Sequence, residues 1–306
     1  MKARQATRWT LAAVTCGGAL ACGGATPEAP AAAPEGKSPY RILVTNDDGI
    51  ESPGIQKLAE ALRAVGEVTV VAPCGQRSGA SMSINLNQEI RLRTSEAGHC
   101  VEATPAGAVL FAARALAPES GFDLVVSGIN RGANIGEVSH MSGTIGAAMM
   151  GGYLGMPAVA ASQGGRPGGF EHAAAVAARF VAELRRRGPE TGIVYSLNFP
   201  AATETETRGI AARPMGGSYF RVDYEEVVAE PGEDAGGEHR FRPVFGPPDA
   251  IPAGSDTEAH NEGLVTVTPL RFDWTDRPTV EALEGWDLEA LLGDGGQEGG
   301  SSGTGG

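Results

Sequence analysis

Two adjacent aspartates, Asp47 and Asp48, come shortly after the apolar run Ile42–Val44 and directly precede Gly49. Neighbouring carboxylates repel one another unless a positive charge lies between them. A hard divalent cation such as Mg²⁺ or Mn²⁺ meets that need, because it takes oxygen ligands and retains several waters. An Asp-Asp-Gly segment is also an ordinary turn or helix cap, so the pair alone leaves both interpretations open.

Two further polar, glycine-containing loops follow apolar runs later in the chain. One contains Ser78, and the other contains Asn130 within the segment Ser127–Asn134. In a parallel α/β sheet such loops gather beyond the carboxyl ends of the strands, where ligands bind. Ser78 and Asn130 could therefore add neutral oxygen ligands to the two aspartates.

A fourth loop leads into a helix of small residues. Ser142, Gly143 and Thr144 directly precede the run Ile145–Met150. Hydroxyl groups and unpaired amide N–H groups at a helix N-terminus form a site for an anion, although a Ser/Thr cap without a ligand has the same appearance. A cation site and an anion cradle together predict a phosphoester site. Neither a G-x-G-x-x-G dinucleotide motif after the first strand nor a P-loop is present.

Charge and composition exclude several other classes of protein. The net charge is −13 and the basic residues are scattered, which argues against binding a nucleic-acid polymer. The alternating acidic positions of an EF-hand are missing, and no Cys/His cluster has zinc-site spacing.

Alternating strands and helices must position these four loops. Continuous apolar runs bounded by turns are typical of strands buried on both faces. We predict strands near 41–45, 68–72, 124–127, 158–162 and 193–198, with helices near 55–62, 105–115, 144–154 and 172–187. This alternation predicts an α/β core with a mostly parallel sheet over residues 39–200.

The pattern changes after Pro200. Short β-like segments alternate with Gly/Pro turns over 209–245, and a further strand is predicted at 264–270. We interpret residues 201–292 as a β-rich extension with a hairpin arm that serves oligomer contacts. The tail, 293–306, is almost entirely Gly, Ser and acidic residues and is predicted to be disordered.

The N-terminus has the features of an export signal. Residues 1–22 carry basic residues followed by a short run of small and apolar residues that ends at Cys22. The pattern resembles a bacterial lipoprotein signal, which would lipidate Cys22, although an ordinary cleaved signal is the alternative. Residues 23–38 form a Pro/Ala-rich linker. We therefore expect an exported protein, periplasmic or anchored to the membrane. In such a compartment Cys74 and Cys100 could form a disulfide or remain two buried thiols.

The loops resemble the motifs of the SurE family of 5′/3′-nucleotidases. The resemblance extends over about Arg41 to Leu270, and its motifs are Ile42–Ile50, Arg77–Ser81, Val126–Asn134, Ser142–Thr144 and two C-terminal segments, 254–256 and 263–270. It implies a Rossmann-like three-layer core with a C-terminal β-hairpin extension, in a dimer or tetramer. It also implies one divalent ion on Asp47, Asp48, Ser78 and Asn130, with Asn134, Ser142, Gly143 and Thr144 around the phosphate.

The resemblance predicts a metal-dependent phosphomonoesterase that hydrolyses nucleoside 5′- and 3′-monophosphates, with Asp47 and Asp48 as its catalytic residues. Water activated at the metal could be the nucleophile, or Asp47 could form a covalent phosphoaspartate. His140 could protonate the leaving group or be a loop histidine without that role. Base selectivity is expected from aromatic residues of the arm, Tyr219, Phe220 or Tyr224.

Two other classes of function remain open from the sequence. A metal-dependent glycosyl- or nucleotidyl-transferase also places an acidic pair after a strand, but it needs a second, acceptor site. A non-catalytic exported nucleotide-binding protein would have no need for the acidic pair.

Overall fold

The computed structural model describes residues 39–164, 169–200, 205, 207–218, 220–227 and 239–292. The predicted signal, linker and tail, together with Cys22 and Tyr219, lie outside these residues. In the described part of the chain, no helix is both long and apolar enough to cross a membrane.

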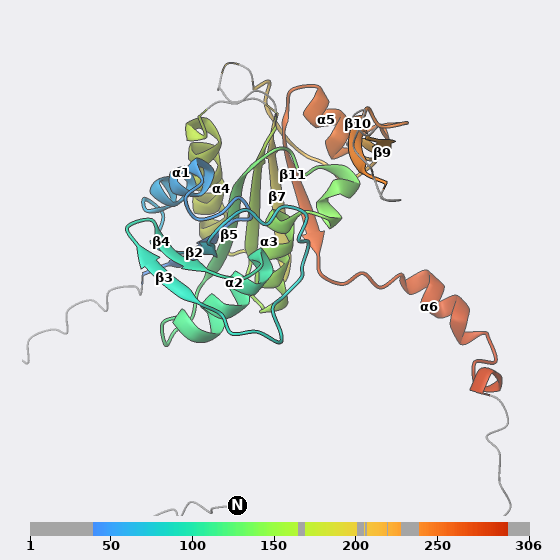
Figure 1. Ribbon diagram of the computed structural model, residues 1–306, viewed down its shortest axis with the longest axis horizontal. Coiled ribbons are helices and arrows are strands. Elements are labelled where there is room, and N and C mark those ends of the chain that lie inside the picture. The colour runs from blue at the N-terminus through green and yellow to red at the C-terminus, as the bar shows by residue number, and fades with distance from the viewer. Residues whose placement is uncertain are drawn as a thin grey trace, which may run out of the picture. The chain divides into compact units, whose positions relative to one another are not determined.

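A nine-stranded sheet forms the centre of the fold (Figure 1), in the strand order β3-β4-β2-β1-β5-β6-β7-β11-β8. Its inner strands pair in parallel, and β3 and β11 are antiparallel to their neighbours β4 and β7. The strands are β1 (Arg41–Thr45), β2 (Glu67–Pro73), β3 (Leu92–Ser95), β4 (Gly98–Val101), β5 (Leu124–Arg131), β6 (Ala158–Gln163), β7 (Ile193–Phe199), β8 (Ile210–Ala212) and β11 (Val265–Arg271).

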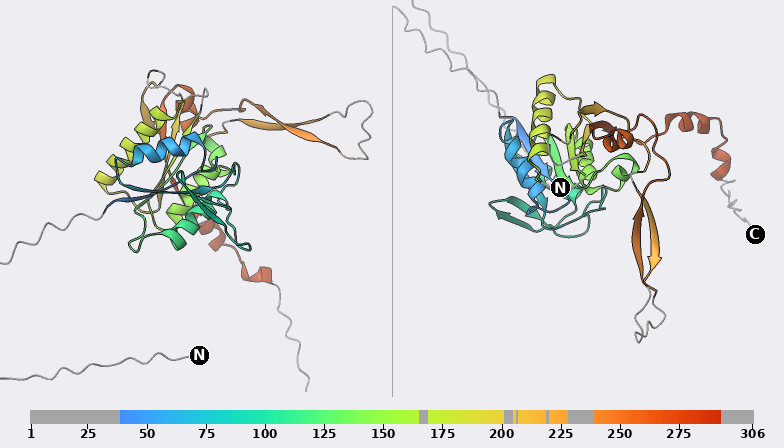
Figure 2. Two further views of the ribbon diagram at one scale, coloured as in Figure 1. Left: turned by 60° about the vertical axis from the view of Figure 1, so that its left-hand side comes forward. Right: turned by 90° about the horizontal axis from the view of Figure 1, so that it is seen from above.

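Helices cover both faces of this sheet. In Figure 2, α1 (Pro53–Leu62, blue) and α4 (Glu171–Arg187, yellow-green) lie on one side, while α2 (Pro105–Phe111) and α3 (Gly143–Tyr153) lie on the other. Each face has its own apolar core, one built on Leu58 and Val181 and the other on Val109 and Ala148. The structure thereby confirms the predicted Rossmann-like three-layer α/β core with its mostly parallel sheet.

The segments after residue 200 divide between the central sheet and a hairpin. Strands β8 and β11 join the central sheet, so the sheet crosses the boundary predicted at residue 200. Strands β9 (Arg221–Glu226) and β10 (Phe241–Gly246) pair antiparallel in a separate two-stranded sheet, which is the predicted hairpin. Two short helices, α5 (Asp256–Asn261) and α6 (Arg277–Glu284), lie in this part of the chain, and a 3₁₀ segment, Glu289–Leu292, follows α6.

An irregularity in β5 shifts the end of that strand. Ser127 pairs with Ala160, but Asn130 pairs with Ser162, so β5 has one residue more than its neighbour between these two pairs. Gly128 has a positive φ of 131°, and a Cβ there would lie 2.2 Å from the carbonyl oxygen of Ala161. Only glycine fits so close to the neighbouring backbone. Bulges of this kind re-aim the side chains that follow them, which here include Asn130.

Candidate active site

Asp47 lies at the carboxyl end of β1, against the N-terminus of α3. Its side chain is buried, and its Oδ1 accepts a hydrogen bond of 2.5 Å from the hydroxyl of Thr144. Gly143 packs directly on Asp47, because a Cβ at Gly143 would lie 2.8 Å from the Cβ of Asp47 and 3.0 Å from its Oδ2. The predicted metal site and the predicted phosphate cradle therefore adjoin one another.

The loop that carries the acidic pair is held by the fully buried Asn46. The side-chain amide of Asn46 donates to the carbonyl of Gly49 at 2.9 Å and to the hydroxyl of Ser52 at 2.8 Å. From the other side, the backbone N–H of Arg77 donates to the carbonyl of Asp47 at 2.6 Å. These bonds fix the turn after β1 and dock the loop that contains Ser78 against it.

Asp48 is linked to the end of β5. Its Oδ2 accepts a hydrogen bond of 3.0 Å from the backbone N–H of Arg131. The side chain of the neighbouring Asn130 is mostly buried and donates its amide to the carbonyl of Gly132 at 2.8 Å. That bond uses the amide nitrogen and leaves the amide oxygen, which is the atom that a cation would take.

Burial disfavours the charge on both aspartates. It raises the pKa of Asp47 to about 6, with the nearby Asp48 adding to the rise and the hydroxyl of Thr144 opposing it. Burial also raises the pKa of Asp48, against the opposing effects of the backbone amide and the charge of Arg131. In the described part of the chain, no Lys, Arg or His forms an ion pair with either carboxylate. The ionised pair therefore favours a cation that is not part of the protein.

The donor set fits a hard divalent cation. No three His, Cys, Asp or Glu side chains of the described residues converge in a group that could hold a metal ion by themselves. Two carboxylates with neutral oxygens from Asn130 and Ser78 would instead form an all-oxygen site, the kind that Mg²⁺ and Mn²⁺ prefer. Ser78 is exposed on its loop and accepts a hydrogen bond of 3.3 Å from Gln76, and no hydrogen bond joins it to Asp47 or Asp48.

The first turn of α3 combines both interpretations that the sequence left open. The hydroxyl of Ser142 caps the helix by accepting a hydrogen bond of 3.2 Å from the backbone N–H of Ile145. The hydroxyl of Thr144 donates a hydrogen bond to Asp47. The backbone amide of Thr144 also lowers the pKa of the Asp47 carboxyl. The small Gly143 lies between them, at a helix N-terminus whose dipole favours an anion.

Asn134 is held at the ends of β6 and β7. Its backbone N–H donates to the side-chain oxygen of Asn198 at 2.7 Å, and its side-chain amide donates to the hydroxyl of Ser162 at 2.9 Å. The hydroxyl of Ser139 in turn donates to the carbonyl of Asn134 at 2.9 Å. Ser162 and Asn198 were not predicted as site residues, and only the register of three adjacent strands reveals them.

Asp256 positions the segment that leads into the cradle. Its buried carboxylate accepts hydrogen bonds of 3.0 Å from the backbone N–H groups of Gly136 and Gly216. Gly136 begins the 3₁₀ segment Gly136–His140, which is followed by Met141 and then Ser142. Asp256 thus holds two distant loops in place beside α3.

Cys74 and Cys100 are joined in a disulfide, so they are not two buried thiols. The bond connects β4 to the residue that follows β2 and precedes the Ser78 loop. Further along that loop, Ser81 donates its backbone N–H to the carbonyl of Met141 and its hydroxyl to the carbonyl of His140. The loop is therefore fixed both at its start and near its end.

Two pockets border the site. One, of about 220 Å³, is lined by Asp48, Gln76, Arg131 and neighbouring residues. The other, of about 330 Å³ and largely apolar, lies beside the first turns of α3. Its lining residues include Ser81, His140, Gly146, Met149 and Trp274.

Comparisons with known proteins agree with this geometry. The family model described as "Survival protein SurE" matches residues 42–221. The chain is 39% identical over 251 residues to proteins named 5′/3′-nucleotidase SurE from Yersinia pseudotuberculosis serotype O:1b (strain IP 31758) and from Yersinia pestis (strain Pestoides F), an alignment that covers 80% of this chain and 95% of each relative. The crystal structure of SurE protein from Aquifex aeolicus has a TM-score of 0.71 and 31% identity over 83% of this chain and 100% of that chain. The family match, the level of identity and the shared fold show that this chain belongs to the SurE family.

Proposed function

We propose that this chain is a metal-dependent phosphomonoesterase that hydrolyses nucleoside 5′- and 3′-monophosphates to nucleoside and phosphate. The observation that carries the proposal is the contact between Asp47 and the N-terminus of α3, through Thr144 and Gly143. If Asp47 binds the cation and the first turn of α3 binds the phosphate, that contact makes the two sites direct neighbours. The family relatives named 5′/3′-nucleotidase supply the substrate class.

Asp47, Asp48, Asn130 and Ser78 would hold one divalent cation, Mg²⁺ or Mn²⁺. When bound, such an ion neutralises charge on the phosphate oxygens and lowers the pKa of a coordinated water. The first turn of α3, from Ser142 to Thr144, would orient the remaining phosphate oxygens with its dipole and amides. Asn134 would complete the cradle from the ends of β6 and β7.

Water is the nucleophile that the geometry favours over Asp47. One oxygen of Asp47 is hydrogen-bonded to Thr144, and the other lies against Gly143. A carboxylate that accepts a hydrogen bond at one oxygen and would hold a cation at the other is a weaker nucleophile than a water molecule activated at that cation. If a phosphoaspartate at residue 47 can be trapped during turnover, this assignment is wrong.

The activity is tested by phosphate release from a panel of nucleoside 5′- and 3′-monophosphates. We expect release with Mn²⁺ or Mg²⁺ and none after EDTA, with recovery when the metal is restored. Glu183→Gln is a suitable control, because Glu183 lies on the exposed surface of α4, away from this site. If no phosphomonoester is cleaved by the folded chain in the presence of either metal, the proposed function is wrong.

We also propose export of this chain with lipidation of Cys22, and assembly as a dimer or tetramer through the hairpin. The first proposal rests on the sequence of residues 1–22 and the second on the family resemblance. Partition of the full chain into membranes, before and after Cys22→Ala, tests the anchor. Mass measured in solution, with and without the β9–β10 hairpin, tests the assembly.

A further inference from the structure

The apolar pocket beside α3 is lined by residues that flank the proposed phosphate cradle in the sequence. Gly146 and Met149 line it from α3, one to two turns beyond Gly143. Ser81 lines it from the loop that carries Ser78, and His140 lines it from the segment before Ser142. A phosphate held at the N-terminus of α3 would therefore lie between residues that line this pocket, His140 before it and Ile145 after it.

The pocket's size and lining suit one aromatic ring system of a ligand. Its volume is about 330 Å³, and methionine side chains form much of its apolar wall, namely those of Met82, Met149 and Met215. Methionine is flexible and polarisable, and its sulfur makes favourable contacts with aromatic rings. Polar groups of Ser139, Arg271 and Asp273 are also among the lining residues. An apolar pocket with a few polar groups is the usual form of a small-molecule site.

Trp274 stands at the edge of this pocket with its ring largely uncovered. It is 70% exposed, and the ring of His140 meets it nearly perpendicularly, at 89° and 6.1 Å between centroids. The same residue also lines a second apolar hollow, of about 410 Å³, together with Met82 and Phe272. An exposed indole at the mouth of an apolar pocket is a stacking surface for a planar ligand.

We infer that this pocket binds the base of the nucleoside monophosphate and that Trp274 is a specificity-determining residue that stacks on it. The inference rests on the proposed function for the position of the phosphate. It assigns base selection to Trp274 and not to the arm residues expected from the sequence, because neither Phe220 nor Tyr224 lines this pocket. Purines are favoured over pyrimidines, since their larger rings gain more from stacking on the indole.

A kinetic comparison tests the role of Trp274. The measured quantity is the ratio of kcat/KM for adenosine 5′-monophosphate to that for ribose 5-phosphate, which has no base. Because stacking of one base on an aromatic side chain is worth about 1–3 kcal/mol, Trp274→Ala should lower this ratio by about 5- to 150-fold, mainly through KM. Trp274→Phe should retain most of the ratio. The control Trp286→Ala changes another exposed tryptophan, which does not line the pocket, and should leave the ratio unchanged. An unchanged ratio in Trp274→Ala overturns the inference.

A binding measurement separates failure of this inference from failure of the proposed function. The chain has three tryptophans, and Trp9→Phe with Trp286→Phe leaves Trp274 as the only one. Adenosine, which has no phosphate, should quench its fluorescence saturably, uridine more weakly, and ribose not at all. Quenching without any phosphatase activity would retain the base pocket and reject the proposed function. Activity without quenching by adenosine would retain the function and reject the pocket.

Discussion

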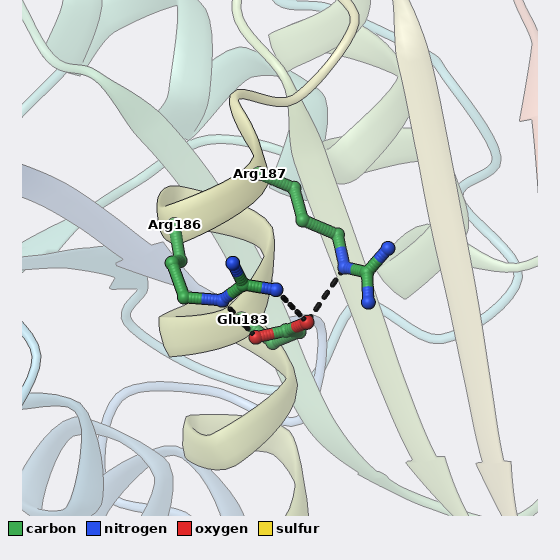
Figure 3. Close-up of polar contacts among 3 residues, drawn as sticks. All are labelled: Glu183, Arg186 and Arg187. Carbon is green, nitrogen blue, oxygen red and sulfur yellow. Dashed lines mark hydrogen bonds and ion pairs between the residues drawn. The ribbon is translucent and has the colours of Figure 1, made fainter.

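Two carboxylates of this protein lie in opposite surroundings. One belongs to Asp47, just after β1, and the other to Glu183, near the end of α4. Glu183 is partly exposed on the surface of α4 and accepts hydrogen bonds from Arg186 and Arg187 at 2.6–2.7 Å (Figure 3), which lower its pKa to about 2. Asp47 is buried, its side chain contacts a neutral hydroxyl, and burial raises its pKa to about 6. The surface carboxylate has its cations within the protein, whereas the buried one has none among the described residues.

The difference indicates what each carboxylate contributes. Exposed ion pairs add little to stability, because solvent screens them and ordering long side chains opposes them. A buried carboxylate without a cation is unfavourable for the folded state, and such groups are concentrated at functional sites. We therefore expect changes at the buried groups to have large effects and changes at Glu183 to have small ones.

The largest effect is expected for Asp47→Asn. Loss of a ligand charge from the proposed metal site should lower kcat for nucleoside monophosphates at least about a thousandfold. Asparagine has nearly the same shape and can still accept the hydrogen bond from Thr144, so thermal stability should be retained. Phosphate release and a thermal melt of the same preparation measure both quantities. Turnover within tenfold of the unchanged protein would remove Asp47 from the catalytic site.

His260 extends the comparison to a buried base. It lies on α5, and burial lowers its pKa from 6.5 to about 4. Below pH 6.5 the unfolded chain takes up a proton that the folded chain does not accept until about pH 4, so this residue makes stability fall as pH falls across that window. The total loss should be about 3 kcal/mol.

Denaturant unfolding of the unchanged protein and of His260→Gln, at pH 7.5 and at pH 4.5, isolates this contribution. The unchanged protein should lose more free energy of unfolding between the two pH values than the variant does. Equal losses would show that His260 does not titrate as proposed.

A smaller effect is expected from the neutral partner of Asp47. Thr144→Val removes the hydroxyl that donates to Asp47 and leaves the buried carboxylate without that bond. The free energy of unfolding near pH 8 should fall by about 1–3 kcal/mol. Thr144→Ser, which keeps a hydroxyl, should recover most of the loss. If valine and serine give the same stability, the hydrogen bond does not stabilise the fold.

The smallest effect is expected for Glu183→Gln on the exposed face of α4. The substitution removes both ion pairs, yet the midpoint of thermal unfolding should stay within the error of the melt at physiological ionic strength. A melt at low and at high salt checks this expectation. A clear loss of stability that persists in high salt would show that the Glu183–Arg186–Arg187 group matters more than its exposure indicates.

The sequence predicted the inner strands and the long helices well, because strands buried on both faces appear as continuous apolar runs. The strand predicted at Arg41–Thr45 has the same first and last residues as β1. The hairpin β3–β4 was not predicted, since neither of its short strands has a continuous apolar run and all of β3 is exposed. The return of β11 to pair antiparallel with β7 was also missed, because strand order across a sheet leaves little trace in sequence.

The candidate site was predictable in its parts but not in its connections. Polar residues at strand ends identified Asp47, Asp48 and Asn130. The hydrogen bond from Thr144 to Asp47 joins residues 97 positions apart, and only the folded chain reveals it. Only the folded chain likewise reveals that Trp274 lines a pocket together with residues of α3, because no local sequence pattern indicates it.

The central claim is that the acidic pair after β1 is the metal-binding half of a phosphatase site, and calorimetric titration of Mn²⁺ into the full chain tests it most directly. The account predicts one bound ion per chain in the unchanged protein and loss of that binding in Asp47→Asn, with the variant still folded by circular dichroism. Equal Mn²⁺ binding by both proteins, or none by the unchanged protein, would contradict it.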